Sequence, residues 1–152
     1  MHNRLNSSRI QKKISDVKEN LQVLKEYACK EESAFLSNAE SIRAARYSFI
    51  VMIEASTNIA NHLCTRLLNL PPGSYAESFV LLGNNKIIPS VLSIRLGKMA
   101  SFRNLLVHGY GKVDDRKMLE IMKNDLEDVE EMLQEFHRLL LENKEVDNDN
   151  AR

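Results

Sequence analysis

Residues 89–110 read PSVLSIRLGKMASFRNLLVHGY, and apolar residues recur through this stretch at steps of three and four. One stripe consists of Leu92, Leu96, Met99, Arg103, Leu106 and Tyr110. Because residues three and four apart share one face of an α-helix, the pattern predicts a helix that starts at Pro89 and ends between Val107 and Gly111. A second apolar side consists of Val91, Ile94, Phe102 and Leu105. We expect a helix with two apolar sides to be central, or to pack both on its own bundle and on another subunit.

Helical patterns also account for the rest of the chain. Apolar stripes predict further helices over residues 8–28, 37–67, 74–83 and 115–140. A serine followed three residues later by Gln or Glu, a pattern typical of helix starts, occurs at Ser8, Ser37 and Ser74. The sequence therefore predicts an all-α bundle of four main helices plus one short helix. We expect a single domain over residues 1–146, followed by a flexible polar tail over residues 147–152.

Composition and charge limit the classes of function. The chain has 152 residues, of which 43% are hydrophobic and 28% charged, which is typical of one globular domain. Its 21 basic and 21 acidic residues give zero net charge, which argues against a protein that coats nucleic acid nonspecifically. The balance is uneven, because residues 86–117 carry a surplus of five positive charges and residues 118–152 a surplus of seven negative ones. A local cationic site beside an acidic helix is one interpretation, and solvated faces with ion pairs between neighbouring helices are the other.

The two cysteines, Cys29 and Cys64, are isolated, without the Cys/His spacing of a metal site. We therefore expect no disulfide, no metal and no other cofactor, and a reducing, cytoplasmic location. The N-terminus has no apolar signal segment, and no window contains the roughly 18 apolar residues that suggest a membrane span.

Arg103 occupies a position where the helical period asks for an apolar residue. Because burying an unpaired charge is costly, its guanidinium needs a carboxylate partner, an interface or an anion. His108 lies five residues later, about 140° around an ideal helix, so the two side chains do not share a face of a straight helix. A helix that loosens at Gly109 and Gly111 would allow both to contact one phosphate. A structural histidine near the helix C-terminus, where the dipole favours a cation, is the simpler alternative.

The spacing Arg-x4-His-x-Tyr, formed by Arg103, His108 and Tyr110, resembles the signature of the HepT-type toxins of the HEPN superfamily. Three further segments are similar to those of the family: ASTNIANHL at residues 55–63, PGSYAESF at residues 72–79 and KMASFRN at residues 98–104. The similarity covers about residues 8–140, nearly the whole chain.

This resemblance implies a metal-independent endoribonuclease that works as a homodimer, assembled through the helix that carries the motif. Arg103 and His108 would be the catalytic residues, and RNA the substrate. The implied partner is a minimal nucleotidyltransferase antitoxin, which would neutralise the toxin by transferring AMP to Tyr110, as in a type VII-like toxin–antitoxin system. The residue types suit this chemistry, because histidine exchanges protons near neutral pH and arginine binds phosphate through two parallel hydrogen bonds. AMP on Tyr110 would place bulk and negative charge where the substrate phosphate must lie.

Other polar residues are candidates for supporting roles. One strip at helical spacing consists of Glu54, Asn58, Asn61 and His62. We expect its asparagines or its histidine to line the cleft or to support the catalytic pair, and its glutamate is a candidate ion-pair partner for Arg103. A hydrogen-bonded strip between helices, without a function of its own, is the alternative. Asn104, Lys98 and Lys112 are candidates for RNA binding, with solvated charge as the alternative for the lysines.

Two other functional interpretations stay open from the sequence. In the first interpretation, the chain is a non-catalytic HEPN-type binding module, which pairs with a nucleotidyltransferase or binds RNA or nucleotide without cleaving it. It would otherwise be a structural helical oligomer, in which Arg103 and His108 form only interface ion pairs. The chain has no glycine-rich phosphate loop, so we do not expect it to be the nucleotidyltransferase itself.

Overall fold

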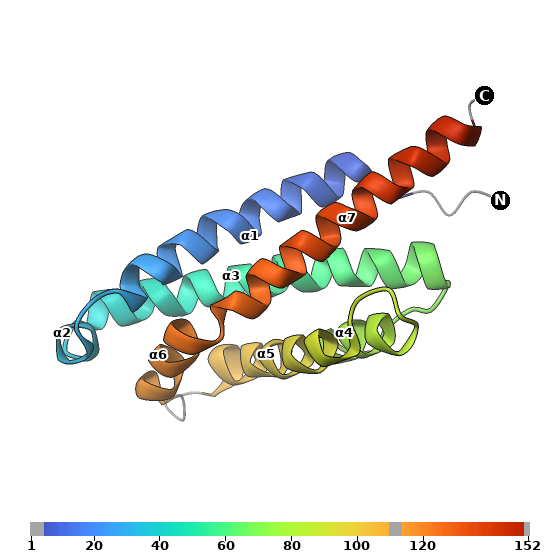
Figure 1. Cartoon of the computed structure of the whole chain (residues 1–152). Helices are drawn as coiled ribbons and strands as arrows, with labels where there is room; N and C mark the ends of the chain where they lie inside the picture. The colour runs from blue at the N-terminus through green and yellow to red at the C-terminus, as the bar shows by residue number, and fades with distance from the viewer. Residues whose placement is uncertain (1–4, 110–113, 151–152) are drawn as a thin grey trace.

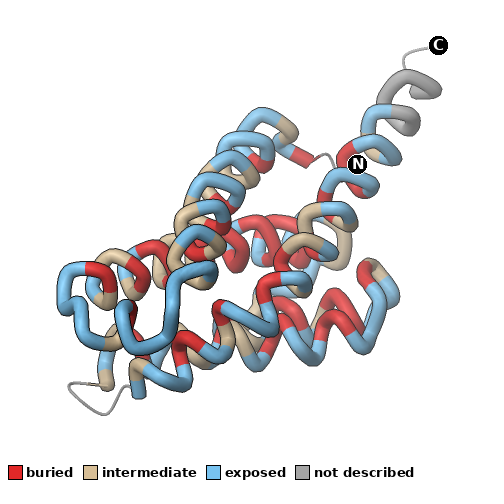
Figure 2. The backbone as a smooth tube through the Cα atoms, turned by 60° about the vertical axis from the view of Figure 1, so that its left-hand side comes forward, coloured by how far each residue is buried: buried red, intermediate tan, exposed pale blue. Residues whose placement is uncertain are grey.

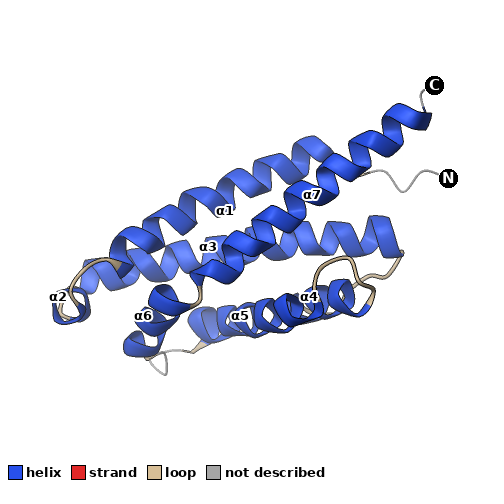
Figure 3. Ribbon diagram, in the orientation of Figure 1, coloured by secondary structure: helices blue, strands red, loops and turns tan. Residues whose placement is uncertain are grey.

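The computed structural model describes residues 5–109 and 114–150, with side chains as far as Lys144, and every regular element in this part of the chain is helical (Figure 3). Long helices form the bundle: α1 (Ser7–Ala28), α3 (Ala39–Leu63), α5 (Ser90–His108) and α7 (Leu126–Asn150). Shorter elements connect them: α2 (Glu32–Leu36), the π-helical turn η1 (Cys64–Leu68), α4 (Tyr75–Asn84) and α6 (Asp115–Asn124). The predicted all-α class is confirmed.

Helix α3 lies at the centre of the bundle, because α1, α4 and α5 all pack against it (Figure 1). Helix α7 runs beside α1 and also contacts α5. Buried positions alternate with exposed ones along each long helix, so that every helix turns one side to the shared core (Figure 2). The largest fully buried side chains include Phe35, Phe49, Phe79 and Phe136. Helices α3, α4 and α5, which carry the candidate site, are therefore held by one continuous core.

Asparagines begin α1 and α3, in place of the predicted serines. The side chains of Asn6 and Asn38 accept hydrogen bonds from the backbone N–H groups three residues later in the chain. The predicted starts at Ser8 and Ser37 are wrong, because an asparagine side chain binds the same free N–H groups and lies at the position where each helix begins. The short helix α2, which the sequence did not predict, begins where the Glu31 carboxylate accepts from the next free N–H groups.

The predicted second helix changes its geometry before it ends. Helix α3 stops at Leu63, and the chain continues through the wider turn η1 to Leu68. Asn69 then adopts a left-handed conformation with φ of 54°, which asparagine tolerates better than most residues. The N–H of Leu70 bonds back to the carbonyl of Cys64 and closes the turn. The helical path thus extends one residue beyond its predicted end.

Helix α4 begins as predicted, because Oγ of Ser74 accepts a hydrogen bond from the N–H of Glu77 at 3.1 Å. It ends at Asn84, one residue beyond the predicted stop at Gly83. Gly83 is buried, and a Cβ atom at this position would overlap the side chain of Ser93 on α5. The glycine therefore allows α4 and α5 to approach closely and does not mark a turn.

The predicted last helix is divided in two. Helix α6 ends at Asn124, and Asp125 leaves the helical path with φ of −114° and ψ of 0° before α7 starts at Leu126. Aspartate is a poor residue for a helix interior, which fits a break at this point. Helix α7 then continues to Asn150, which lies within the predicted tail. The domain boundary at residue 146 and the flexibility of the tail stay predictions.

Candidate functional site

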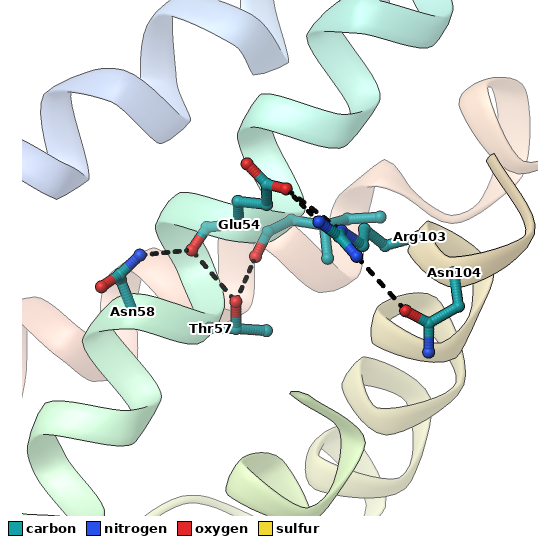
Figure 4. Close-up of polar contacts among 6 residues, drawn as sticks. Glu54, Thr57, Asn58, Arg103 and Asn104 are labelled. Atoms are coloured by element: carbon teal, nitrogen blue, oxygen red, sulfur yellow. Dashed lines mark hydrogen bonds and ion pairs between the residues drawn. The ribbon is translucent and has the colours of Figure 1, made fainter. Parts of the chain in front are cut away.

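Arg103 extends from α5 toward α3, and its side chain is only 18% exposed (Figure 4). Its Nε and Nη2 atoms donate hydrogen bonds of 3.1 and 2.5 Å to the same oxygen, Oε1 of Glu54 on α3. The position of Arg103 in an apolar stripe predicted a carboxylate partner, an interface or an anion. Its partner is the carboxylate of Glu54, which was a predicted candidate. The Glu54 side chain is 38% exposed, so the ion pair lies at the edge of the core and keeps contact with water.

Two more side chains hold the guanidinium. The ring centroid of Tyr75, at the start of α4, lies 4.9 Å from the guanidinium carbon, which is a cation–π arrangement. Oδ1 of Asn104 accepts a hydrogen bond of 3.4 Å from Nη1 of Arg103. Arg103 thus has partners on α3, α4 and α5, and its planar group has a fixed orientation.

A polar cleft of about 350 Å³ adjoins this arrangement, between the second half of α3 and the turn before α4. Its lining residues are Thr57, Asn58, Asn61, Pro72, Gly73, Ser74, Tyr75 and Ser78. Tyr75 lines this cleft and also contacts the guanidinium, so one residue connects the two. Of the predicted supporting residues, Asn58 and Asn61 therefore line a cleft next to Arg103, and Asn104 contacts Arg103 directly.

His108 is exposed and is the last residue of α5. The N–H of Gly109 still bonds to the carbonyl of Leu105 at 2.8 Å, so the helix does not loosen at Gly109; Gly111 lies outside the described residues. Arg103 and His108 therefore lie about 140° apart on a regular helix. The Arg103 guanidinium turns toward Glu54 on α3, whereas His108 lies on an exposed side of α5.

The side of α5 that carries His108 faces away from the core. At alternating steps of three and four it presents Val91, Ile94, Lys98, Ser101, Leu105 and His108. The apolar members are unusually exposed for their type, with Val91 at 60%, Ile94 at 57% and Leu105 at 40%. Phe102, which the sequence placed on the same side, instead packs edge-on against Phe49 with ring centroids 5.6 Å apart. Lys98 lies on this outer face, away from Arg103.

His62 has a different environment from its neighbour Asn61. It is buried, and its Nε2 atom accepts a hydrogen bond of 3.1 Å from the backbone N–H of Asn6. Burial lowers the pKa of His62 below its ordinary value of 6.5, and the nearby cations Arg66 and Arg9 lower it further. His62 thus fastens the start of α1 to α3 and does not line the cleft beside Arg103.

Tyr110 and Lys112 lie outside the described residues. The residue that sequence reasoning did not single out is Tyr75, which contacts Arg103 and lines the cleft. It lies within PGSYAESF, a segment that resembles the HepT-type toxins, but a single aromatic residue after a turn has no periodic signal that would assign it a role.

Part of the basic segment is neutralised by ion pairs between helices. Arg95 lies 3.6 Å from Asp128 on α7, and Arg116 lies 3.0 Å from Glu32 on α2. For Arg95 and Arg116, these contacts support the interpretation that the charged faces of neighbouring helices form ion pairs. The described residues include no group of three or more His, Cys, Asp or Glu side chains arranged to hold a metal ion. In the same ranges, none of the helices combines the length and the apolar character that a membrane span requires.

Comparison with known sequences places these features in a family. The model of ribonuclease HepT-like proteins matches residues 17–136. The mRNA nuclease HepT of Shewanella oneidensis is 35% identical over 80 residues, a match that covers 53% of this chain and 60% of that protein. The chain thus spans about 60% of the length of this curated relative.

Comparison with solved structures gives the same assignment. A tri-AMPylated Shewanella oneidensis HEPN toxin, in complex with MNT antitoxin, superposes with a TM-score of 0.79 at 26% identity, over 86% of this chain and 97% of that one. YutE of Bacillus subtilis, a cytosolic protein of unknown function, shares the fold with a TM-score of 0.78 at 17% identity, over 92% of this chain and 93% of that one. The family model covers most of the chain, and the resemblance carried by Arg103, His108 and Tyr110 is confirmed: the chain belongs to the ribonuclease HepT-like family.

Proposed function

We propose that the chain is an endoribonuclease that cleaves RNA without a metal ion and acts as the toxin of a type VII-like toxin–antitoxin system. The observation that carries the proposal is Arg103, a guanidinium held by Glu54 and by Tyr75, which lines a polar cleft, in a chain of this family. The relatives named above, an mRNA nuclease and a HEPN toxin bound to an antitoxin, support the same function. We place this activity in the cytoplasm.

The cleavage step needs a base, an acid and a cation. One His108 imidazole takes the proton from the 2′-hydroxyl of RNA, and the 2′-oxygen then attacks the adjacent phosphorus. The bond from phosphorus to the 5′-oxygen breaks, and a second His108, protonated beforehand, donates a proton to the leaving oxygen. The products are a cyclic phosphate and a 5′-hydroxyl. The Arg103 guanidinium stabilises the negative charge that develops on the phosphorane oxygens.

This division of roles needs two copies of the chain. Each chain supplies one His108, so an active site with two histidines takes the second from another subunit. Because Arg103 and His108 lie on different faces of α5, a second copy is also a way to bring both residue types together. The exposed apolar side chains beside His108 support a homodimer that forms through the outer face of α5. A mixed dimer in which only one subunit carries His108→Ala is expected to lose most of the activity, because it keeps only one of the two histidines.

We further propose that a minimal nucleotidyltransferase antitoxin inactivates the toxin by transferring AMP to Tyr110. The support is the position of Tyr110 two residues after His108 and the AMPylated state of the HEPN toxin named above. Intact mass, measured after incubation with the partner and ATP, is expected to rise in units of AMP. In Tyr110→Phe this rise is expected to be absent, and a persisting rise would move the acceptor to another residue.

The test of the ribonuclease is expression of the chain without a partner, as wild type, Arg103→Ala and His108→Ala. The wild type is expected to degrade RNA and arrest growth, and both variants to lose this effect. His137→Ala removes an exposed histidine on α7 and serves as the matched control, with full activity expected. Equal cleavage by all variants, or intact RNA in all of them, would show that the catalytic assignment is wrong.

One observation favours a second candidate function, a non-catalytic module that binds a nucleotidyltransferase or RNA. Two of the hydrogen bonds of the Arg103 guanidinium go to Glu54, so the arginine is satisfied within the chain and does not need a substrate for its stability. The same expression experiment separates the candidates. A binding module would leave RNA intact in every variant and still copurify with the partner.

A further inference from the structure

We infer that the cleft beside Arg103 binds a single nucleobase of the RNA strand, next to the phosphate that is cleaved, and thereby sets base preference; this inference rests on the proposed ribonuclease function. The cleft has a volume of about 350 Å³, within the range of sites for small molecules. Tyr75 lies against Arg103 and also lines the cleft, so a single side chain connects the cleft with the guanidinium.

The charge of the cleft fits a base better than a phosphate. None of the lining side chains is a Lys, Arg, Asp or Glu. The neighbouring start of α4 already has its own acceptors: the N–H of Gly73 donates to Glu77 at 3.0 Å, and the N–H of Glu77 donates to Ser74 at 3.1 Å. The Glu77 carboxylate therefore repels an anion at this point. The phosphate belongs at Arg103, and the cleft accommodates the neutral part of the nucleotide.

Two asparagine amides in the cleft are available for hydrogen bonds with a base edge. Nδ2 of Asn58 donates to the backbone carbonyl of Glu54 at 3.2 Å, which leaves its Oδ1 as an acceptor (Figure 4). The side chain of Asn61 is exposed and makes no hydrogen bond within the described ranges of the chain. Amide groups pair with the donors and acceptors of unstacked bases in single-stranded RNA.

Helical spacing aligns these amides with the catalytic arginine. Glu54, Asn58 and Asn61 follow one another at steps of four and three, so they share one face of α3. The face runs from the Arg103 ion pair into the cleft. Tyr75 is still 38% exposed, and its ring offers an aromatic surface for stacking. Tyr75 thus offers a partner for the face of a base, the asparagine amides for its edge, and Arg103 for the neighbouring phosphate.

The experiment compares four single-stranded RNA oligonucleotides that differ only in the nucleotide beside the cleaved bond. The wild type is expected to discriminate among them by about 10-fold or more in kcat/KM, as expected for hydrogen bonds to a base edge. Asn58→Ala and Asn61→Ala are each expected to reduce this preference to about 2-fold. Tyr75→Leu is expected to lower kcat/KM for all four RNAs by about 10-fold, because stacking does not depend on the base. Asn124→Ala, at an exposed asparagine on α6, is the matched control and should keep the wild-type preference.

The possible failures are distinguishable. If the wild type cleaves RNA but shows no base preference, or if the asparagine variants keep it, the inference is overturned and the ribonuclease proposal stands. If these variants keep the preference but no longer bind the nucleotidyltransferase, the cleft is a protein-docking site. If the wild type cleaves none of the RNAs and leaves cellular RNA intact, the proposed function itself fails, and the inference with it. Thermal unfolding of each variant confirms that the fold is retained.

Discussion

The guanidinium of Arg103 donates two hydrogen bonds, of 3.1 and 2.5 Å, to a single carboxylate oxygen of Glu54. Glu54 has two effects in this arrangement: it orients the guanidinium, and it neutralises its charge. A phosphate that binds Arg103 must share the guanidinium with this carboxylate and is repelled by its charge. The two effects act in opposite directions on RNA cleavage, and two different substitutions separate them.

Glu54→Gln keeps an oxygen acceptor for Arg103 but removes the negative charge. We expect this variant to bind RNA more tightly, with KM lowered by about 5-fold, which corresponds to about 1 kcal/mol for a partly exposed charge. Its kcat is expected to stay within about 2-fold of the wild type, because the guanidinium keeps its orientation. Steady-state kinetics on one RNA substrate measure both constants. Glu120→Gln makes the same change of charge at an exposed position on α6 and should leave KM unchanged at moderate salt.

Glu54→Ala removes both the acceptor and the charge. The guanidinium then loses its fixed position, and kcat is expected to fall by about 10-fold even though the repulsion of the phosphate has gone. The free energy of unfolding is expected to fall by about 1–2 kcal/mol, because a mostly buried cation loses its carboxylate partner. Kinetics and denaturant unfolding measure the two losses. A variant with normal kcat would mean that Glu54 does not position Arg103.

The outer face of α5 gives a prediction about assembly. Ile94 is 57% exposed on the side of the helix that carries His108. Ile94→Asp is expected to convert a dimer into monomers, because a carboxylate in an apolar interface is costly. Leu141→Asp changes an apolar residue of 49% exposure on α7 and should leave the mass unchanged. Light scattering coupled to gel filtration reports the mass of each variant, and a monomeric wild type would contradict the proposed interface.

Helical periodicity predicted the fold class and the positions of the main helices, because each long helix buries one side in the shared core. It was less informative about helix ends. The pattern of Ser followed by Glu at Ser37 was misleading, since Asn38 lies one residue closer to the helix and binds the free N–H group. The break at Asp125 was also missed, because the apolar stripe continues across it into α7.

The candidate site was predictable only in part. The unfavourable position of Arg103 in an apolar stripe indicated that it needed a partner, and Glu54 was among the candidates. Which partner it has depends on how α3 lies beside α5, and local periodicity does not determine that. The separate environments of Asn61 and His62 are a similar case. Adjacent residues of a helix point in directions about 100° apart, so one lines the cleft and the other faces α1.

His62 gives a prediction about pH. Its pKa is lowered in the folded protein, chiefly by burial, so the unfolded chain binds the proton more readily. The contribution of His62 to stability is therefore complete above its ordinary pKa of 6.5. It is lost as the pH falls from 6.5 through the lower pKa of the folded state. Protonation also removes the lone pair that accepts from the N–H of Asn6.

Denaturant unfolding between pH 5 and pH 8 tests this contribution. His62→Ala is expected to lower the free energy of unfolding by about 1–2 kcal/mol at pH 8, because it leaves the part-buried N–H of Asn6 without an acceptor. The variant should also show a smaller decrease in the free energy of unfolding below pH 6.5 than the wild type. His137→Ala, at an exposed histidine, should keep the slope of the wild type. An unchanged slope in His62→Ala would show that another group causes the pH dependence.

Two glycines at the contact of α4 with α5 are expected to respond oppositely to alanine. A Cβ atom at Gly83 would overlap the Ser93 side chain, whereas a Cβ atom at Gly97 would lie 3.7 Å from its nearest neighbour, the carbonyl oxygen of Ala76. We expect Gly83→Ala to lower the free energy of unfolding by about 1–3 kcal/mol through overpacking. Gly97→Ala should be neutral or stabilising by up to about 1 kcal/mol, because alanine favours the helix.

A compensating substitution at Ser93 tests whether steric overlap causes the loss of stability. Ser93→Gly makes room for a methyl group at position 83, so the double variant with Gly83→Ala is expected to be more stable than the sum of the two single effects predicts. Because α4 carries Tyr75, separation of α4 from α5 also shifts the ring that lies against Arg103. Gly83→Ala is therefore expected to lower kcat/KM for RNA, and the double variant to restore part of it. Strict additivity of the two substitutions would show that steric overlap is not what makes Gly83 necessary.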